Sequence, residues 1–172
     1  MPQIVDRAVA FATPWFEVIA KTLENEESPY YSLKLKDYVS IIAKTEDGKI
    51  LLVKQFRPAV ERYTLELPAG LVEEGEIPEK TAIRELSEET GYKADSIELL
   101  GKLVPDTGRL CNRMWCYFCD NVKPEPATFC KDPDIELITC SVDELNELIV
   151  NGEFDHALHL ALIALAFVKN KF

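Results

Sequence analysis

Positive charge is scarce in this sequence. Its 172 residues include 19 lysines and arginines against 30 aspartates and glutamates, which gives a formal net charge of −11. A nucleic-acid-binding surface needs a basic stripe that neutralises phosphates, and the sequence contains no such stripe. Nucleic acid is therefore not an expected partner, although a smaller polyanion can still bind through a metal ion.

Long hydrophobic runs are also lacking. The most apolar segment, ALHLALIALAFV at 157–168, is shorter than the roughly 20 residues of a membrane-spanning helix and predicts a buried helix instead. No signal peptide is recognisable, and the five cysteines are an odd number, so a disulfide framework is not expected. We expect reduced thiols, no membrane association and a cytoplasmic location.

Alternation and turn residues predict a mixture of strands and helices. β-Branched and aromatic residues predict N-terminal strands at 15–23 and 30–43, and the Asp-Gly turn in EDGK at 46–49 predicts a hairpin. Pro78 and Gly91 are typical of the first turn and the C-terminal cap of one helix, from about 78 to 90. Further strands are expected at 97–104, 114–122 and 135–140, and helices from 142 to near 152 and from 155 to 169.

The expected helix at 78–90 is crowded with glutamates. Glu85, Glu88 and Glu89 share one helix face, because residues three and four apart are neighbours. Their mutual repulsion calls for a counter-charge, and oxygen ligands favour a hard cation, Mg²⁺ or Mn²⁺, which commonly shares its coordination with substrate phosphates. A solvated acidic helix face is the alternative interpretation of the helix alone.

The spacing of residues around these glutamates carries a resemblance. The fixed positions of one signature are filled by Gly70, Glu76, REL at 84–86, EE at 88–89 and a glycine-tyrosine pair at 91–92, with tyrosine where an aliphatic residue is more usual. Residues 70–92 thus resemble the Nudix box of the Nudix hydrolases.

The resemblance extends beyond the box. QFRP at 55–58, ELPAG at 66–70 and PDTGRLCNR at 105–113 are similar to the ADP-ribose/ADP-sugar pyrophosphatase branch of that family. It implies an α/β fold, a Nudix α/β/α sandwich with an additional N-terminal antiparallel sheet. Residues 1–172 would then form a single Nudix hydrolase domain, in which the sheet of residues 1–43 mediates homodimerisation.

The same resemblance implies roles at the box. It implies that Glu85 and Glu89 are metal ligands and that Glu88 is a third ligand or accepts a proton from a metal-bound water. The carbonyl of Ala69 would complete the coordination shell of the metal. Arg84 joins these glutamates as a catalytic-site residue, and an ion pair of Arg84 with Glu76 that braces the loop is favoured over contact with substrate.

Substrate-binding roles are implied elsewhere in the chain. Arg57 is expected to contact the substrate's phosphate or terminal ribose, with a rim salt bridge as the alternative. Glu66 in ELPAG and Arg109 in the 105–113 motif are further candidates. Trp15 is expected to stack on the nucleobase or to pack in an interface, with Tyr30 or Tyr31 as a second aromatic.

The function that the resemblance implies is Mg²⁺-dependent hydrolysis of a nucleoside diphosphate sugar. ADP-ribose or another ADP-sugar is the expected substrate, cleaved to AMP and a sugar phosphate. The alternatives are a UDP-glucose or GDP-mannose pyrophosphatase, a non-catalytic Nudix module that binds a nucleotide as a regulator, and action on capped RNA ends, which the acidic charge disfavours.

One loop departs from the family pattern. Relatives commonly carry a glutamate there that supplies a base or an extra metal ligand, whereas this chain reads CKDPDIEL at 130–137, with proline near the expected position. The candidates for the base are Asp132, Asp134, Glu136 and the box residue Glu88. The histidines at 156 and 159 are expected to have packing or surface roles rather than to bind zinc, because no acid cluster adjoins them in sequence.

Overall fold

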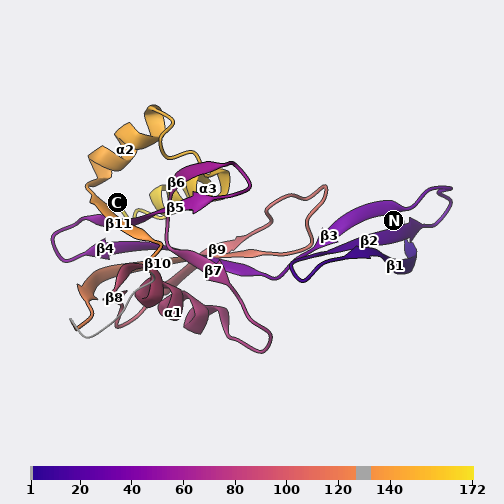
Figure 1. Ribbon diagram of the computed structural model, residues 1–172, viewed down its shortest axis with the longest axis horizontal. Helices are drawn as coiled ribbons and strands as arrows, with labels where there is room; N and C mark the ends of the chain where they lie inside the picture. Colours follow the sequence, from indigo (N-terminus) through magenta and orange to yellow (C-terminus); the bar gives the residue numbers. More distant parts are fainter. Residues whose placement is uncertain (1, 127–132) are drawn as a thin grey trace.

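The computed structural model describes residues 2–126 and 133–172 (Figure 1). Strands and helices follow one another from the N-terminus to the C-terminus. They are β1 Ile4–Ala12, β2 Glu17–Leu23, β3 Tyr30–Lys34, β4 Tyr38–Thr45, β5 Ile50–Arg57, β6 Arg62–Glu66, β7 Ala69–Leu71, α1 Pro78–Thr90, β8 Tyr92–Lys93, β9 Glu98–Leu103, β10 Met114–Pro124, β11 Glu136–Cys140, α2 Val142–Val150 and α3 Ala157–Val168.

The main body is a mixed sheet between helices. Strands β4 and β10 run parallel at its centre, and β11, β5 and β9 add antiparallel pairings. Helix α1 covers one face, while α2 and α3 cover the other (Figure 1). The expected α/β/α sandwich is therefore confirmed.

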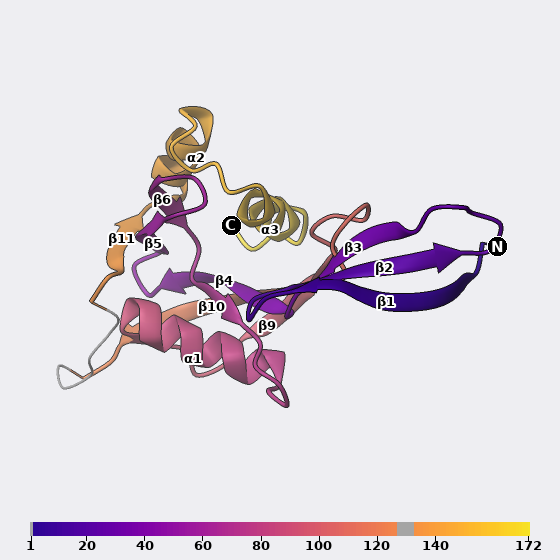
Figure 2. The same cartoon turned by 45° about the vertical axis from the view of Figure 1, so that its right-hand side comes forward.

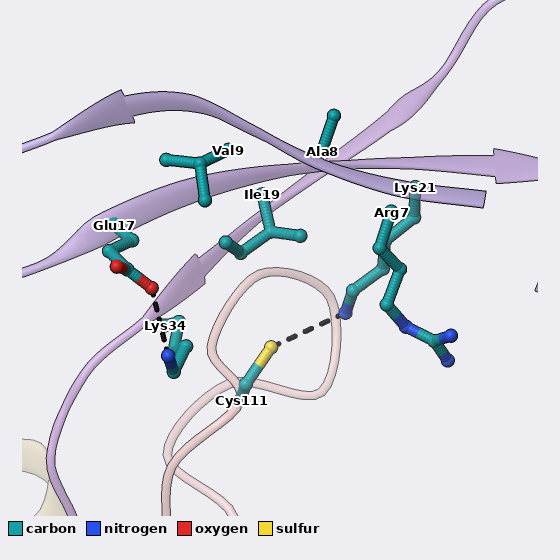
Figure 3. Close-up of a pocket in the computed structure, with 8 residues that line it drawn as sticks. All are labelled: Arg7, Ala8, Val9, Glu17, Ile19, Lys21, Lys34 and Cys111. Carbon is teal, nitrogen blue, oxygen red and sulfur yellow. Dashed lines mark hydrogen bonds and ion pairs between the residues drawn. The ribbon is translucent and has the colours of Figure 1, made fainter.

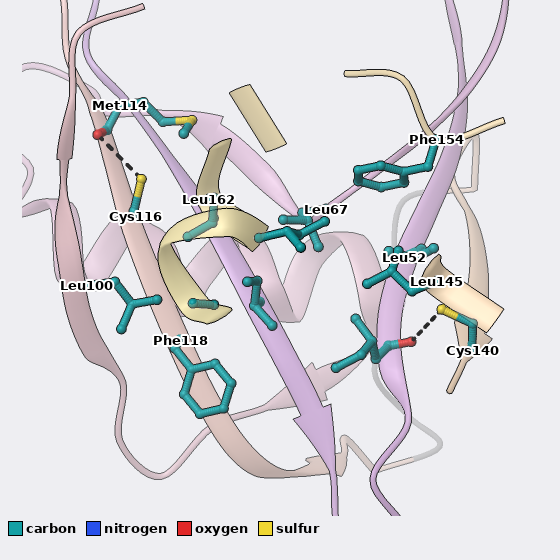
Figure 4. Packing of buried hydrophobic residues seen from close by; sticks show 14 residues of the cluster. Leu52, Leu67, Leu100, Met114, Cys116, Phe118, Cys140, Leu145, Phe154 and Leu162 are labelled. Carbon is teal, nitrogen blue, oxygen red and sulfur yellow. Dashed lines mark hydrogen bonds between the residues drawn. The ribbon is translucent and has the colours of Figure 1, made fainter. Parts of the chain in front are cut away.

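Two hydrophobic clusters fill the sandwich, one on each side of the sheet. Leu145 of α2 and Leu162 of α3 pack on the first face (Figure 4), and Leu86 of α1 packs on the second. Cys116 and Cys119 lie three apart on β10 and therefore belong to opposite clusters, because side chains alternate along a strand. Their C-x-x-C spacing thus serves packing.

The N-terminal sheet projects from this body (Figure 2). It contains the antiparallel strands β1, β2 and β3, and it ends at Lys34 rather than at residue 43. The expected strand at 30–43 is wrong as a single strand, because the chain leaves one sheet at 34 and enters the other at 38. Asp37 fixes this break: its carboxylate accepts hydrogen bonds from the Arg113 backbone N–H (2.8 Å) and the Trp115 indole N–H (3.1 Å).

The local predictions around α1 are confirmed. The helix has the expected bounds, and Gly91 caps it with a left-handed backbone, φ 70°. The hairpin at 46–49 joins β4 to β5, with Gly48 at φ 81°. Within the described ranges, no helix has both the length and the apolar character needed to cross a bilayer.

Candidate active site

Two box glutamates are held against the turn that precedes α1. The Oε2 atom of Glu89 accepts a hydrogen bond from the backbone N–H of Ala69 (2.9 Å), and the carboxylate of Glu85 lies against Gly70. Any Cβ atom at residue 70 would overlap that carboxylate. The short strand β7 therefore brings the Ala69-Gly70 backbone and two carboxylates into one small volume.

Arg84 ties the remaining acids of the box together. Its guanidinium donates to both oxygens of Glu76 at 3.2 Å and lies 2.8 Å from the carboxylates of Glu85 and Glu88. The hydrogen bonds that Arg84 donates hold the pKa of Glu76 at about 2, and the same hydrogen bonds raise the pKa of Arg84. This geometry agrees with the expected bracing role, and it also links Arg84 directly to two candidate metal ligands.

Burial leaves the two inner glutamates without full charge compensation. Removal from water raises the pKa of Glu89 to about 8, and the single backbone hydrogen bond from Ala69 only partly opposes this effect. Burial also raises the pKa of Glu85, more than its contact with Arg84 lowers it. Glu89 is buried and Glu85 is partly buried, and two such carboxylates close to one another fit a hard divalent cation, whose charge would favour their ionised forms. Glu88 is more exposed, with 51% of its side chain open to solvent.

Arg57 and Glu66 form a paired unit at the ends of β5 and β6. The Nε and Nη2 atoms of Arg57 donate to the two oxygens of Glu66 at 2.7 and 2.6 Å, and Thr64 donates a third hydrogen bond at 2.7 Å. Burial alone would raise the pKa of Glu66, but these hydrogen bonds outweigh it and hold the pKa at about 2. Glu66 therefore orients Arg57, whose side chain is only partly buried.

A small pocket connects this pair to the box. It has a volume of about 180 Å³, and Arg57, Glu66, Ala69 and Gly70 are among its lining residues. Tyr38 and Leu71 line both this pocket and a second one of about 380 Å³. We call the first the box pocket and the second the tryptophan pocket, because Trp15 lines it. Trp15 is 76% exposed, so its ring is accessible to a ligand.

Other predicted site residues lie elsewhere. Arg109 is exposed and lines neither pocket, while Tyr30 and Tyr31 are exposed on β3. Glu136 forms an exposed ion pair with Lys54 (3.1 Å) on the face of β11 and β5. Asp134 lines a separate pocket beside Phe56 and Tyr63, and Asp132 lies outside the described residues.

A third pocket, of about 400 Å³, lies against the N-terminal sheet (Figure 3). Ile19 and Val9 supply its apolar surface, and the Lys21 ammonium lies 3.4 Å from the Cys111 sulfur. The hydrogen bond with Ser32 and the nearby Lys21 lower the pKa of the Cys111 thiol, although burial opposes them. None of the residues expected to act on substrate lines this pocket.

Sequence reasoning missed the surroundings of the two histidines. His156 and His159 line the box pocket, and ligand atoms of both lie within 4.8 Å of one another and of Glu66. One acid, Glu66, therefore lies beside the histidines in space, although no acid cluster adjoins them in sequence. No sequence signal indicates the contact, since it arises where α3 packs against the end of β6.

Comparison with known proteins fits this geometry. Residues 34–161 match the family model described as the NUDIX domain. This chain belongs to the Nudix family. Hydrolases of the family generally use divalent metal ions.

Several curated Nudix relatives are similar over part of their length. The chain is 34% identical over 117 residues to the ADP-ribose pyrophosphatase of Bacillus subtilis (strain 168), which covers 67% of this chain and 63% of that protein. It is 35% identical over 113 residues to the methanol dehydrogenase activator of Bacillus methanolicus, covering 64% and 61%. A stretch of 59 residues is 52% identical to the ADP-sugar pyrophosphatase of Mus musculus, covering 34% and 27%. The chain thus spans less than two-thirds of each relative.

A solved structure confirms the fold over nearly the whole chain. The crystal structure of an ADP compounds hydrolase matches with a TM-score of 0.82 at 20% identity, and the match covers 99% of this chain and 94% of that one. At this identity the likeness establishes the architecture alone.

Proposed function

We propose that this protein hydrolyses the diphosphate linkage of a nucleoside diphosphate sugar in a reaction that depends on Mg²⁺, with Mn²⁺ as an alternative metal. ADP-ribose or another ADP-sugar is the substrate, and AMP and a sugar phosphate are the products. The observation that carries this proposal is the pair of carboxylates of the partly buried Glu85 and the buried Glu89, at the turn that lines the box pocket with Arg57.

The metal site is assigned to Glu85, Glu88, Glu89 and the Ala69 carbonyl. A divalent cation, when bound, would neutralise charge on the phosphoryl oxygens and activate the attacking water. The Ala69 N–H orients Glu89, and Arg84 orients Glu85 and Glu88 through its guanidinium.

The proton from the attacking water goes to an acid that solvent reaches. Glu88 suits this role, because half of its side chain is exposed while its carboxylate stays 2.8 Å from Arg84. A positioned carboxylate near the box can accept the proton as the transition state forms.

Arg57 is the proposed phosphate-binding residue. Its guanidinium is held by Glu66 along one edge, which fixes the planar group before substrate arrives and reduces the conformational entropy lost on binding. Glu66 therefore acts in binding through Arg57, and it does not need to contact substrate itself.

The nucleobase is assigned to the tryptophan pocket. This pocket shares Tyr38 and Leu71 with the box pocket, so a substrate can reach from the metal-binding turn to Trp15 within one chain. Stacking on an exposed indole contributes on the order of 1–3 kcal/mol per base. Arg109 lines neither pocket, and a role for it in binding stays a prediction.

A homodimer and a cytoplasmic location complete the proposal. Strand β1 is exposed along its whole length, including Val5, Val9 and Phe11, and a second subunit would cover this surface. The cytoplasmic location stays a prediction from the cysteine content of the sequence.

A substrate panel tests the proposed activity. ADP-ribose, other ADP-sugars, UDP-glucose, GDP-mannose and dinucleoside polyphosphates are incubated with Mg²⁺, and phosphate is read out after a coupled phosphatase. We expect the highest kcat/KM for an ADP-sugar and loss of that activity in Glu85→Gln. A clear preference for a uridine or guanosine substrate would reject the adenine assignment.

Regulation by nucleotide binding is the second candidate, since one relative is a methanol dehydrogenase activator. Calorimetry separates the two functions. ADP-ribose that binds tightly but is not turned over with Mg²⁺ or Mn²⁺ would favour the regulatory module and reject the hydrolase.

A further inference from the structure

Two stacked histidines form one wall of the box pocket. His156 is the N-cap of α3, and its Nδ1 atom accepts a hydrogen bond from the His159 backbone N–H (3.3 Å). The two imidazole rings stack with their centroids 3.8 Å apart and their planes 20° apart. The ring of His156 is thereby fixed on one face by His159 and at one edge by the helix backbone.

His159 is the inner member of the stack. It is 1% exposed, and its Nδ1 atom accepts a hydrogen bond from the Leu67 backbone N–H (3.1 Å). Burial lowers the pKa of His159 to about 3, with a smaller contribution from His156, so this imidazole is neutral at physiological pH. Through Leu67, which follows Glu66, His159 attaches the stack to the chain that leads into the Ala69-Gly70 turn.

The chemistry of the donors argues against a metal ion between these histidines and Glu66. Each Nδ1 atom accepts a backbone hydrogen bond, and in a neutral imidazole the other nitrogen, Nε2, then carries the proton. The oxygens of Glu66 already accept hydrogen bonds from Arg57 and Thr64. The cluster therefore offers N–H donors, whereas a transition metal requires lone pairs.

These donors suit an anion. We propose that His156 is a substrate-binding residue whose Nε2–H donates a hydrogen bond to a phosphoryl oxygen of the diphosphate, beside the Arg57 guanidinium. The inference rests on the proposed function and adds to it a contact from α3. His159 is a positioning residue, since it acts only through the ring of His156.

The charges around the pocket favour a phosphoryl oxygen over a sugar hydroxyl. Glu66 is engaged with Arg57, so Arg57 and His156 present donors to this pocket, while Glu85 and Glu89 lie against the Ala69-Gly70 turn that also lines it. A diphosphate carries charge on both phosphates, and a metal site at the turn together with N–H donors from Arg57 and His156 would compensate both.

The test separates two roles of His156, as the N-cap of α3 and as the proposed donor to substrate. His156→Asn keeps a side-chain acceptor for the His159 N–H, because asparagine is a good N-cap, but its amide is too short to replace the imidazole Nε2–H. His156→Ala loses both interactions. Asp155→Ala is the matched control, since Asp155 is exposed, pairs with Arg62 at the surface and lines neither pocket.

We expect the KM for ADP-ribose to rise about ten- to a hundredfold in His156→Asn and His156→Ala, the range for one hydrogen bond to a charged group. The value of kcat should stay within about threefold, and the thermal unfolding midpoint of His156→Asn should match that of the wild type. Asp155→Ala should keep the wild-type KM. A His156→Asn variant with a wild-type KM overturns the inference.

Binding measured without turnover distinguishes this inference from the proposed function. ADP-ribose is titrated calorimetrically into wild type and His156→Asn in EDTA. Weaker binding by the variant supports the inference even if the wild type hydrolyses nothing, a result that would reject the proposed function alone. Equal affinities would overturn the inference and leave a measured hydrolase activity intact.

Discussion

The carboxylate of Glu85 occupies the space that a side chain on Gly70 would need. A Cβ atom placed on Gly70 would lie 2.0 Å from Cδ of Glu85 and 2.1 Å from its Oε1 atom. Because no real Cβ contact is that short, the glycine is required by the position of a side chain that also belongs to the box. Gly70 and Glu85 are thus one structural unit, fifteen positions apart in the chain.

Gly70→Ala should therefore impair metal binding more than folding. The clash falls on the end of a flexible side chain, so Glu85 can rotate away, and the free energy of unfolding should change by less than about 1 kcal/mol. The displaced carboxylate should weaken Mg²⁺ binding at least about tenfold, measured by titrating activity with Mg²⁺. The control is Gly101→Ala on β9, where the new Cβ meets only Leu165 Cδ2 at 3.2 Å. Unchanged Mg²⁺ dependence in Gly70→Ala would contradict the assignment of Glu85.

Glu89→Gln should separate folding from metal dependence. The amide keeps the shape of the side chain and an acceptor for the Ala69 N–H, but it removes the charge that attracts the cation. We expect Mg²⁺-dependent turnover to fall more than about a hundredfold, since a metal supplies several kcal/mol of transition-state stabilisation.

In Glu89→Gln, Mg²⁺ should no longer raise the thermal unfolding midpoint. A ligand present at a hundred times its Kd stabilises the folded state by about 2.7 kcal/mol, so millimolar Mg²⁺ should raise the unfolding midpoint of the wild type. Glu79→Gln, in the exposed first turn of α1, should respond as the wild type does. A normal midpoint shift in Glu89→Gln would remove Glu89 from the metal site.

The contribution of His159 to stability should fall in mild acid. Its pKa is lowered to about 3 in the folded protein from 6.5, so its contribution to stability is complete above pH 6.5 and is lost as the pH falls towards 3. Between pH 7.5 and pH 5 this loss amounts to about 2 kcal/mol. Glu89 acts in the opposite sense, because its pKa of about 8 makes the folded state gain stability as the pH falls from 8 to 4.5.

A comparison of variants isolates the histidine. His159→Asn keeps an acceptor for the Leu67 N–H but does not titrate, so it should lose about 2 kcal/mol less than the wild type on going from pH 7.5 to pH 5. Urea unfolding at the two pH values measures this difference. An identical pH dependence in the two proteins would mean that His159 takes up a proton in the folded state as readily as in the unfolded state.

The site residues whose positions could be predicted from the sequence are those on a single helix, α1. Pro78 and Gly91 fix the bounds of α1, and helical spacing then places Glu85, Glu88 and Glu89 on one face. The positions of most strands along the chain followed from alternation and turns for the same local reason, but β1 and the order of strands in the sheets were not predicted.

The parts that were not predictable depend on contacts between distant segments. The strand at 30–43 breaks because Asp37 accepts hydrogen bonds from Arg113, just before β10, and from Trp115, at the start of β10. The histidines meet Glu66 only because α3 packs over the end of β6. Neither contact alters the alternation of apolar and polar residues within its own segment, so the periodicity of the sequence does not indicate it.

The N-terminal sheet should assemble two subunits. Light scattering at micromolar concentration should give about 39 kDa, twice the 19.5 kDa of one chain. Val9→Glu combined with Phe11→Glu places charge on exposed apolar positions of β1 and should yield monomers with an intact body. A wild-type mass of 19.5 kDa would refute the dimer.

The general base should be a box residue. Glu136 is engaged by Lys54 and exposed, and Asp134 lines a pocket beside Phe56 and Tyr63 rather than the box pocket. We therefore expect Asp134→Asn and Glu136→Gln each to lower kcat by less than about tenfold, near 1.4 kcal/mol. Asp132 lies outside the described residues, and the same tenfold limit on kcat is applied to Asp132→Asn.

Glu88→Gln supplies the contrast in that series. Its amide still accepts a hydrogen bond from Arg84 but cannot accept a proton, so kcat should fall more than about a hundredfold. KM should change little, because a proton acceptor acts only as the transition state forms. If Asp132→Asn, Asp134→Asn or Glu136→Gln instead loses more than a hundredfold in kcat with an unchanged circular dichroism spectrum, the base is that residue rather than Glu88. Glu88 would then keep only a role as metal ligand, since its carboxylate still lies beside Arg84 and Glu85.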